Sequence, residues 1–409
     1  MTITRRGAIA AGAGTLAGLP FARARAQAAN TIKIGVLNDQ SGTYRDLSGP
    51  GSTICVRQAI SELGALGFNV EVVQADHQNR PDVGSTIART WFDRDGVDAI
   101  LDVPTSSVAF AVSGIAREKN KVFLNSGAAA SDLTGAQCNP NTIHWTYDTW
   151  MLAKGTGGAM VRAGGDTWFF ITADYAFGHA LERDTVAFVR AAGGRVLGQV
   201  RTPFPGTTDF SSYLVQAQAS RAKVIGLANA GADTINSIKQ AAEFGITRRG
   251  VKLAGLLVFI TDVHSLGLPT AQGLVLTETF YWNLNDRTRA LTQRVRGNMP
   301  GNQPPSMVQA GCYSAALHYL KTVKDMGAAA AKADGAATIA RMKAMPADDD
   351  AFGAGSIRPD GRKIHPAYLF EVKTPAESTA PWDYYKLLQT VPADEAFRPL
   401  AEGGCTLVR

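Results

Sequence analysis

The stretch 99–127, AILDVPTSSVAFAVSGIAREKNKVFLNSG, decides the fold. Two short apolar runs, AILDVP at 99–104 and KVFLNSG at 121–127, flank an apolar helical pattern that opens on three hydroxyl residues. Parallel strands cannot be joined by a tight turn and are usually connected by a crossover helix. The stretch therefore predicts one strand–helix–strand unit of a parallel sheet.

The same alternation runs from Thr31 to residue 280, with helical patterns such as 51–66 and 232–245 between the apolar runs. Strict alternation of this kind predicts parallel sheets covered by helices on both faces, which is an α/β fold. A long amphipathic helix is predicted at 309–327 and a hairpin within 352–373. The other predicted strands are 32–38, 69–76, 166–172, 194–201, 223–229, 251–259 and 273–280.

The chain is too long for one compact core, and the first series of strands and helices ends near Trp145 to Met151. We expect two doubly wound parallel-sheet lobes joined by a multi-strand hinge. The predicted first lobe holds residues 29–147 and 281–352, and the predicted second lobe holds residues 148–280 and 353–409.

The first 28 residues predict a cleaved export signal. Arg5 and Arg6 precede an apolar run at 7–21, and small-residue cleavage patterns follow at 24–26 and 26–28. The paired arginines favour a twin-arginine signal, and an ordinary secretory signal is the alternative. Both interpretations place the mature protein in the periplasm.

Charge and hydropathy exclude two classes of partner. The signal holds four arginines and no acid, so it carries four of the six net positive charges and leaves +2 for residues 29–409. That small excess does not support nucleic-acid binding. No later apolar run reaches the roughly 18 to 20 residues that a membrane span requires.

Four cysteines allow three complete pairings, and their spacing does not choose among them. Cys138 and Cys405 lie in polar segments, which favours a loop-to-tail disulfide in an exported protein. Cys55 and Cys312 lie in apolar helical patterns and are expected to be buried free thiols. No CxxC pair is present, so we do not expect a zinc site. No other metal site and no cofactor are expected either.

Several segments in order along the chain resemble one family. They are IKIGVLNDQSGTYRDLSGPG at 32–51, DHQNRPD at 76–82, HWTYDTW at 144–150, DYAFG at 174–178 and FYWNLNDRTR at 280–289. The chain resembles the solute-binding proteins of ABC importers of the branched-chain amino acid class, which have a type I periplasmic-binding-protein fold. The resemblance implies two lobes joined by three hinge strands, a small organic solute in the cleft, and delivery to the transmembrane subunits of a permease by a monomeric protein.

Ligands of open parallel sheets bind beyond the carboxyl ends of the strands. Thr105, Ser106 and Ser107 follow one strand and open a helix, whose free N–H groups and dipole suit a carboxylate; simple capping is the alternative. Gly127, Ala128 and Ala129 follow the next strand and allow close approach, or form only a tight turn. The remaining candidate ligand-binding residues are Tyr44, Trp150, Tyr175, Phe177, Asn229, Gly231, Asp233 and Tyr281, of which Asp233 equally suits a helix cap.

The resemblance also bears on the ligand. Amino-acid binders of this family place carboxylates around the ligand ammonium, and our alignment puts Trp150 and Leu257 at those positions. An ammonium without such a partner is costly to desolvate. We therefore expect a carboxylate-bearing solute, an aromatic or hydroxy acid rather than a branched-chain amino acid, unless Asp148, Asp174 or Asp233 supplies the charge.

Two other functions remain as alternatives. A ligand sensor that feeds a membrane receptor needs the same hinge-closing module. An exported enzyme is less well supported, because the sequence has no GxSxG, HExxH or P-loop motif and its six histidines are scattered. The chain is therefore not expected to be an enzyme.

Overall fold

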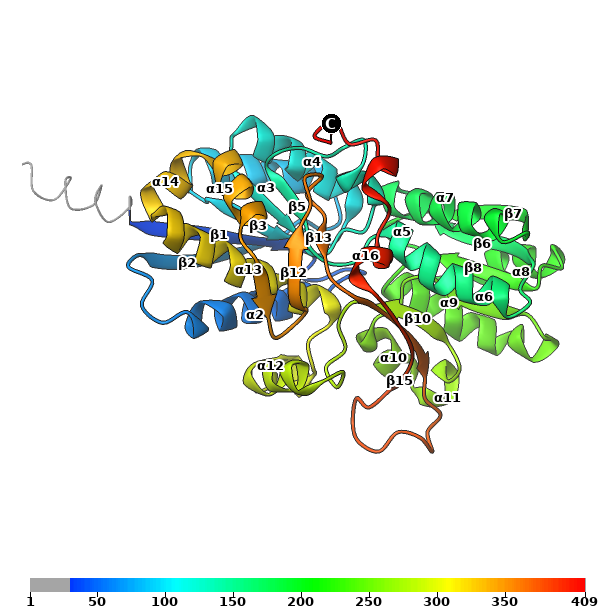
Figure 1. The fold of residues 1–409 in the computed structure, drawn as a ribbon. Helices are drawn as coiled ribbons and strands as arrows, with labels where there is room; N and C mark the ends of the chain where they lie inside the picture. The colour runs from blue at the N-terminus through cyan, green and yellow to red at the C-terminus, as the bar shows by residue number, and fades with distance from the viewer. Residues whose placement is uncertain (1–29, 409) are drawn as a thin grey trace, which may run out of the picture.

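The computed structural model describes residues 30–408 and has two α/β lobes side by side (Figure 1). The first lobe is built on a five-stranded parallel sheet of order β2-β1-β3-β4-β5. Its strands are β1 (Thr31–Asn38), β2 (Asn69–Asp76), β3 (Ala99–Asp102), β4 (Val122–Asn125) and β5 (Thr142–His144).

Helices cover both faces of this sheet because successive side chains of a strand point to opposite faces. Leu101 and Leu124 pack in the cluster that contains α2 and α13 residues, and Ile100 and Phe123 pack in the cluster that contains α3 and α4 residues. The first-lobe helices are α2 (Gly49–Glu62), α3 (Pro81–Asp93), α4 (Ser106–Glu118), η1 (Ser131–Thr134), α12 (Asp286–Arg296), η4 (Pro300–Asn302), α13 (Met307–Met326), α14 (Ala328–Ala333) and α15 (Gly335–Ala344).

The second lobe is built on a four-stranded parallel sheet of order β7-β6-β8-β9. Its strands are β6 (Thr167–Ala173), β7 (Arg195–Thr202), β8 (Val224–Ala228) and β9 (Lys252–Gly255). Its helices are α5 (Thr149–Leu152), the π-helix η2 (Ala153–Gly157), α6 (Gly158–Arg162), α7 (Ala176–Ala191), α8 (Ser211–Ala219), α9 (Ala232–Glu243), η3 (Thr247–Arg249), α10 (Ile260–Leu266) and α11 (Leu268–Ala271).

Two antiparallel sheets complete the fold. Strands β10 (Val275–Glu278), β14 (Ala367–Val372) and β15 (Tyr385–Val391) form one in the second lobe, where Leu276, Phe370 and Tyr385 join its core. The other contains β11 (Ala347–Asp349), β12 (Gly353–Ile357) and β13 (Lys363–Ile364). The tail ends in α16 (Ala393–Ala396) and η5 (Leu400–Glu402).

The predicted α/β fold is confirmed, and each of the nine strand predictions overlaps an observed strand. The hairpin predicted within 352–373 is present as β12 and β13. The export signal predicted for residues 1–28 lies outside the described residues.

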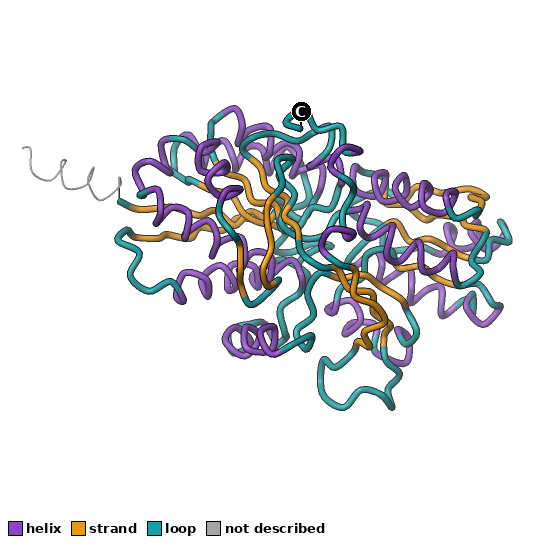
Figure 2. Tube along the Cα trace, viewed as in Figure 1, coloured by secondary structure: helices purple, strands orange, loops and turns teal. Residues whose placement is uncertain are grey.

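The chain crosses between the lobes four times, whereas the family resemblance implies three hinge strands. The order of the elements places the crossings after β5, β10, β13 and β15. Figure 2 shows loop segments of the tube running between the two lobes. The division predicted at residue 352 remains a prediction. Strand β13 pairs with β12, and Arg362 forms a β-bridge with His144 at the end of β5 in the first lobe. We propose that the lobes divide between β13 and β14 and that the end of the chain returns to the first lobe.

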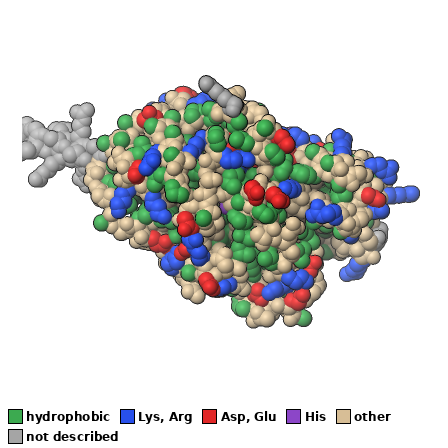
Figure 3. All heavy atoms as spheres, viewed as in Figure 1, with side chains coloured by type: hydrophobic (Ala, Val, Ile, Leu, Met, Phe, Trp, Pro, Cys, Tyr) green, Lys and Arg blue, Asp and Glu red, His purple; other side chains and the backbone are tan. Residues whose placement is uncertain are grey.

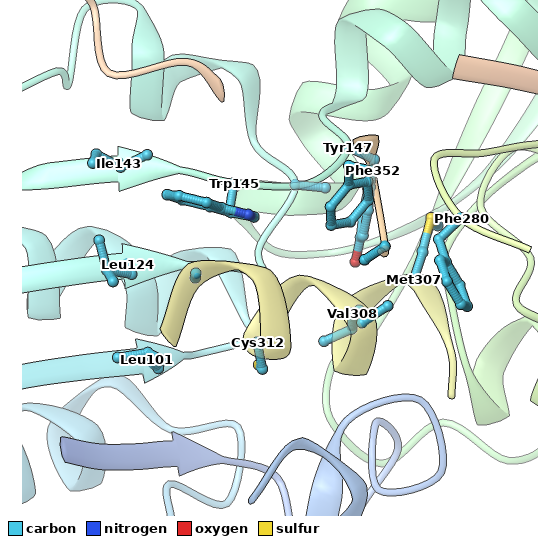
Figure 4. Packing of buried hydrophobic residues seen from close by; sticks show 14 of the residues in the cluster. Leu101, Leu124, Ile143, Trp145, Tyr147, Phe280, Met307, Val308, Cys312 and Phe352 are labelled. Atoms are coloured by element: carbon cyan, nitrogen blue, oxygen red, sulfur yellow. The ribbon is translucent and has the colours of Figure 1, made fainter. Parts of the chain in front are cut away.

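The crossings meet over the start of α13. Figure 4 shows Tyr147, Phe280 and Phe352, from three parts of the chain, around the start of this helix, whose first residue is Met307. A buried hydrogen bond of 2.7 Å from the Trp145 indole to Ser314 Oγ links the first crossing to α13. Buried packing of this kind fixes where the hinge segments run.

A buried ion pair joins two of the crossings. The Arg362 guanidinium is 0% exposed and lies 3.4 Å from the carboxylate of Asp148, which also accepts a hydrogen bond of 2.8 Å from Met151 N and so caps α5. Burial lowers the pKa of Arg362 to about 10, against the opposing effect of Asp148. The guanidinium also stacks on the Phe397 ring at 4.4 Å.

Charged side chains of both signs are interspersed over the face of the molecule shown in Figure 3. Within residues 30–408, none of the helices combines the length and hydropathy that crossing a membrane requires.

Asp148→Asn is expected to lower the free energy of unfolding by about 3 kcal/mol, because asparagine still caps α5 but leaves the buried Arg362 charge uncompensated. Urea unfolding followed by circular dichroism measures the loss. The matched control is Asp174→Asn, whose carboxylate is 54% exposed beside His179 and contributes little to stability. Equal losses in the two variants would contradict the role given to the buried pair.

Candidate functional site

A small cavity lies between the lobes, beyond the carboxyl ends of their parallel strands. Its lining is apolar and aromatic, and none of the described residues that line it carries a charge. The first lobe contributes Tyr44, Leu47, Pro104, Gly127, Ala129 and Tyr147, and the second contributes Tyr175, Phe177, Ala230, Leu257 and Phe259.

The end of β3 shapes the first-lobe side of the cavity. Asp102 and Val103 have positive φ angles of 82° and 60°, a conformation that non-glycine residues adopt at a cost. The Asp102 carboxylate holds this turn in place by accepting hydrogen bonds from Asn38 Nδ2 (2.9 Å) and Ser48 Oγ (2.8 Å). Burial raises the pKa of Asp102 to about 6, although these hydrogen bonds oppose the shift. The turn places Pro104 at the cavity.

Gly127 allows β4 to approach this turn. A Cβ atom on Gly127 would lie 2.6 Å from Pro104 Cα and 2.8 Å from Asp102 Oδ1, both far inside van der Waals contact. Its carbonyl accepts a hydrogen bond of 2.6 Å from the Tyr147 hydroxyl, which fixes that ring in the cavity. Only glycine fits between the ends of the two strands.

Helix α4 starts directly after Pro104 and has no side-chain cap. Thr105 Oγ1 donates instead to Asn79 Oδ1 at 2.5 Å, and Ser106 Oγ accepts from Ala130 N at 3.2 Å. The side chains of Thr105 and Ser106 therefore position the neighbouring loops, and the N–H groups of the first helical turn retain their capacity to bind an anion.

In the second lobe, a buried carboxylate positions Phe259. Asp262 accepts a hydrogen bond of 2.9 Å from Phe259 N at the start of α10. Burial raises the pKa of Asp262 to about 7, partly offset by this bond. The Phe259 ring meets Tyr147 of the first lobe edge to face, with centroids 5.8 Å apart.

The loop 39–48 of the first lobe closes the cavity against the second. Its Tyr44 side chain is 2% exposed, hydrogen-bonds the Tyr175 hydroxyl, and stacks on Phe204 with centroids 5.4 Å apart. Phe204 stacks on Tyr175 at 4.0 Å. Ala232 N donates to Thr43 O across the cleft at 3.2 Å, so the structure is a closed form.

A second set of polar contacts joins the lobes near η1. Asp184 on α7 accepts hydrogen bonds from Ser131 Oγ (2.8 Å) and Thr149 Oγ1 (2.6 Å). Arg183 pairs with Asp132 at 2.9 Å. We call Ser131, Asp132, Arg183 and Asp184 the Asp184 cluster.

Gly231 lies at the tightest approach of the lobes. Its φ of 59° and ψ of −133° suit glycine, and a Cβ atom there would lie 2.4 Å from Thr43 O of the first lobe. A side chain at this position would therefore keep the lobes apart.

Asp233, in the first turn of α9, is a buried carboxylate beside this contact. Its side chain is 2% exposed and Oδ2 has no hydrogen-bond partner among the described residues. Burial raises its pKa to about 7. Burial also raises the pKa values of Tyr44 and Tyr175, and the negative charge of Asp233 raises both further.

The structure brings five of the predicted ligand-binding residues together in the cavity lining, namely Tyr44, Gly127, Ala129, Tyr175 and Phe177. Thr105, Ser106, Ser107 and Ala128 lie beside it at the strand ends, and Gly231 and Asp233 lie at the closure contact.

Three predicted residues lie elsewhere. Trp150 packs on Phe188 with ring centroids 5.2 Å apart, on the side of α5 that faces α7. Tyr281 packs in the second-lobe core, 4.9 Å from the Tyr385 ring. The Asn229 amide is occupied by hydrogen bonds with Thr234 (2.7 Å) and Ser237 (3.1 Å).

Six of the lining residues were not among the predicted ligand-binding residues. Pro104 ends a predicted strand and Ala230 directly follows one, so both were accessible to the strand-end argument. The alignment places Leu257 near the ligand but gives it no binding role, and the other three depend on tertiary packing. The six are Leu47, Pro104, Tyr147, Ala230, Leu257 and Phe259. Among residues 30–408 there is no cluster of histidine, cysteine, aspartate or glutamate able to hold a metal ion.

Two hinged α/β lobes that enclose a small cavity define a ligand-binding protein that works by lobe closure. The model of the family described as periplasmic binding protein matches residues 31–379. The chain belongs to this family.

Three solved structures illustrate its relatives. A periplasmic binding protein from Burkholderia mallei is 48% identical, with 93% of this chain and 100% of that chain covered and a TM-score of 0.88. A branched chain amino acid ABC transporter periplasmic ligand-binding protein from Burkholderia xenovorans is 40% identical (92% and 99% covered, TM-score 0.79). An ABC transporter solute binding protein from R. palustris in complex with 4-hydroxybenzoate shares the fold at 23% identity (89% and 97% covered, TM-score 0.79).

Curated relatives include the Leu/Ile/Val-binding protein homolog 4 of Brucella abortus, which is 24% identical over 242 residues. The matched segment spans 56% of this chain and 58% of that relative.

Gly231→Ala is expected to weaken solute binding by at least about tenfold, because the clash with Thr43 exists only when the lobes close. The main-chain strain of alanine at this φ and ψ is present in both forms, so it should lower the melting temperature without accounting for the loss of affinity. Isothermal titration with the solute that the wild type binds measures the effect. Gly250→Ala is the control: Gly250 also has a positive φ, 84°, but no heavy atom lies within 4 Å of the added Cβ. Unchanged affinity in Gly231→Ala would contradict the closure contact.

Solute affinity is expected to fall as pH rises from about 4 to 7, by at most about tenfold per pH unit for a single proton. Burial raises the pKa of Asp233 to about 7 in this closed form. Because Asp233 lies beside the closure contact, opening is expected to expose it and to return its pKa towards the ordinary value, so acid should favour closure. Asp102 is buried among first-lobe residues, and closure should change its protonation little. The pKa of Asp262 is raised mainly by burial, with a contribution from Asp46 of the first-lobe loop, and the Asp233→Asn variant separates the two acids.

Titrations of the wild type and Asp233→Asn across this pH range test the assignment. The variant should bind with a nearly constant affinity, after correction for the pKa of the solute itself. A pH slope that persists in Asp233→Asn would exclude Asp233 as its source.

Proposed function

We propose that this chain is the extracytoplasmic solute-binding component of an ABC importer, which closes its lobes around a small carboxylate-bearing aromatic or hydroxy acid. The observation that carries the proposal is the cavity between the lobes, whose sides meet through Tyr44, Phe204 and Tyr175. These contacts join residues of both lobes, so a solute that completes the cavity shifts the protein towards the closed form.

The cavity lining suits a planar apolar group. Tyr44, Tyr147, Tyr175, Phe177 and Phe259 offer aromatic faces and edges on both sides, an arrangement that favours stacking with an aromatic ring. The closed lobes leave only a small enclosed space between them, which limits the solute to a small molecule. A small aromatic acid agrees with this lining.

The carboxylate is proposed to bind at the start of α4. Pro104 lines the cavity and α4 begins two residues later with an uncapped first turn, where the helix dipole adds a partial positive charge. Recognition would thus use main-chain N–H groups, with Ser106 and Ser107 available as further hydroxyl donors.

An α-amino group has no good counterpart in this cavity. Leu257 lines it at the position where the family resemblance implies a carboxylate in amino-acid binders. The nearest buried acid at the closure contact is Asp233, whose raised pKa of about 7 leaves it partly protonated at neutral pH. The 4-hydroxybenzoate complex of the R. palustris protein agrees with an aromatic acid, while the name of the 40% identical relative points to branched-chain amino acids.

We further propose that the protein is exported to the periplasm by the twin-arginine route. There it would deliver its solute to the transmembrane subunits of a permease. Lobe closure moves the surfaces of the two lobes relative to each other. A permease could recognise the loaded protein by this change. We propose that the protein does this as a monomer.

A thermal-shift panel of benzoate, 4-hydroxybenzoate, aliphatic hydroxy acids and leucine tests the solute class, after unfolding and refolding to remove any carried ligand. A solute at a hundredfold excess over its dissociation constant should stabilise the protein by about 2.7 kcal/mol. We expect this from aromatic or hydroxy acids and not from leucine.

Tyr175→Ala should abolish the thermal shift. The control is Tyr213→Ala, which should preserve it, because Tyr213 is a half-buried residue of α8 outside the cavity lining. Stabilisation by leucine alone would keep the importer function and overturn the solute class. A panel without any stabilising solute would overturn the proposal.

A further inference from the structure

The C-terminal tail, residues 392–408, forms the fourth connection between the lobes. It leaves β15 in the second lobe, passes through α16 and ends on the first lobe, as the red end of the ribbon shows (Figure 1). The disulfide between Cys405 and Cys138 fixes the end of the tail covalently to the first lobe. The tail is therefore held at both ends, on different lobes.

Along its path the tail contacts the hinge. The Phe397 ring stacks against the buried Arg362 guanidinium at 4.4 Å and meets His365 edge to face at 5.1 Å. Arg398 O accepts a hydrogen bond of 2.8 Å from Arg358 Nη1. On the second lobe, Lys154 Nζ donates to Glu395 O.

Beyond the hinge, the tail packs on the loop 131–138 of the first lobe. Arg398 Nη2 donates to Ser131 O at 3.0 Å, and the disulfide holds the other end of the loop at Cys138. The packing is tight in between: a Cβ atom on Gly135 would lie 2.7 Å from Arg398 Nη2 and 2.8 Å from Gly403 O. The tail thus fixes both ends of this loop.

This loop connects the cavity to the closure contacts. It directly follows Gly127–Ala130, of which Gly127 and Ala129 line the cavity. Its first two residues, Ser131 and Asp132, are the first-lobe members of the Asp184 cluster. A displacement of the loop would therefore move one side of the cavity and break contacts between the lobes at the same time.

We propose that the C-terminal tail positions the ligand cavity: the Cys138–Cys405 disulfide and Arg398 hold residues 127–138 in the conformation that lines the cavity and engages Asp184. These residues do not touch the solute themselves. They act through Ser131 and the main chain of the loop, and solute retention depends on them. The statement about retention rests on the proposed function, whereas the statement about the loop does not.

Hydrogen–deuterium exchange of the ligand-free full-length mature protein tests the first statement. In Cys138→Ser/Cys405→Ser, amides of residues 127–138 should exchange at least about tenfold faster, while those of β1 keep the wild-type rate. Arg398→Ala should accelerate the same segment, and Arg398→Lys, which can still donate to Ser131 O, should restore much of the protection. Arg341→Ala is the matched control, because it removes an exposed pair with Asp325 (2.6 Å) elsewhere on the first lobe.

The proposal would be overturned if amides of residues 127–138 exchanged at the wild-type rate in both the double serine variant and Arg398→Ala. Equal acceleration of every first-lobe segment would also overturn it, because that result would mean a general loss of stability. If the double serine variant fails to fold, the exchange rates of Arg398→Ala and Arg398→Lys test the proposal by the same criteria.

Calorimetric titration with 4-hydroxybenzoate tests retention. In Arg398→Ala the dissociation constant should rise about tenfold, mainly through faster release, with Arg398→Lys close to wild type and Arg341→Ala unchanged. Wild-type affinity in Arg398→Ala would overturn the role in retention. If the wild type itself does not bind any acid of the panel, the proposed function fails, and the exchange result still decides whether the tail positions the loop.

Discussion

Contact between loop 39–48 and the second lobe encloses the cavity, and most other features of the site depend on it. Asp39 holds the loop by accepting hydrogen bonds from the main chain at Gly42 (2.6 Å) and Tyr44 (2.8 Å) and from Asn79 Nδ2 (2.6 Å). Asn79 in turn accepts from Thr105, so the loop and the start of α4 are fixed together. One hydrogen-bonded network therefore sets both the aromatic cover of the cavity and its proposed carboxylate end.

A protein that opens and closes must bend at the hinge without losing the packing of either lobe. Here the crossings share a buried charge pair, Arg362 with Asp148, instead of purely apolar contacts. A buried charge pair tolerates little misplacement, because each charge left without the other is costly in an apolar environment. Such a pair favours a rigid pivot, so the movement is expected at the flanking loops, which need only small changes of main-chain angles.

The sequence was most informative where local periodicity and tertiary structure agree. Alternating apolar strands and helices predicted both parallel sheets, whereas β5 was missed because a three-residue strand has no detectable period. Strand ends predicted Tyr44, Gly127 and Tyr175, since the carboxyl ends of parallel strands must meet at one edge. Trp150 was predicted to bind the ligand, but its side chain packs on Phe188 of α7. The direction of a side chain within α5 depends on how α7 packs, which the sequence does not reveal. Leu257 and Phe259 follow β9 by only a few residues, and their part in the lining comes from the way the second lobe folds over the first.

The hydrogen bonds of the lining tyrosines bear on how an apolar cavity could recognise the proposed carboxylate-bearing solute. The Tyr147 hydroxyl is bound to Gly127 O, and the hydroxyls of Tyr44 and Tyr175 bind each other. These side chains are therefore largely committed to structure and contribute mainly shape and aromatic surface. Main-chain groups at the ends of β3 and β4 and at the start of α4 are left to recognise polarity, and their positions are set by the sheet. On this proposal, changes in the lining would alter which ring or chain fits, while the proposed preference for an anionic end would persist because it would belong to the fold itself.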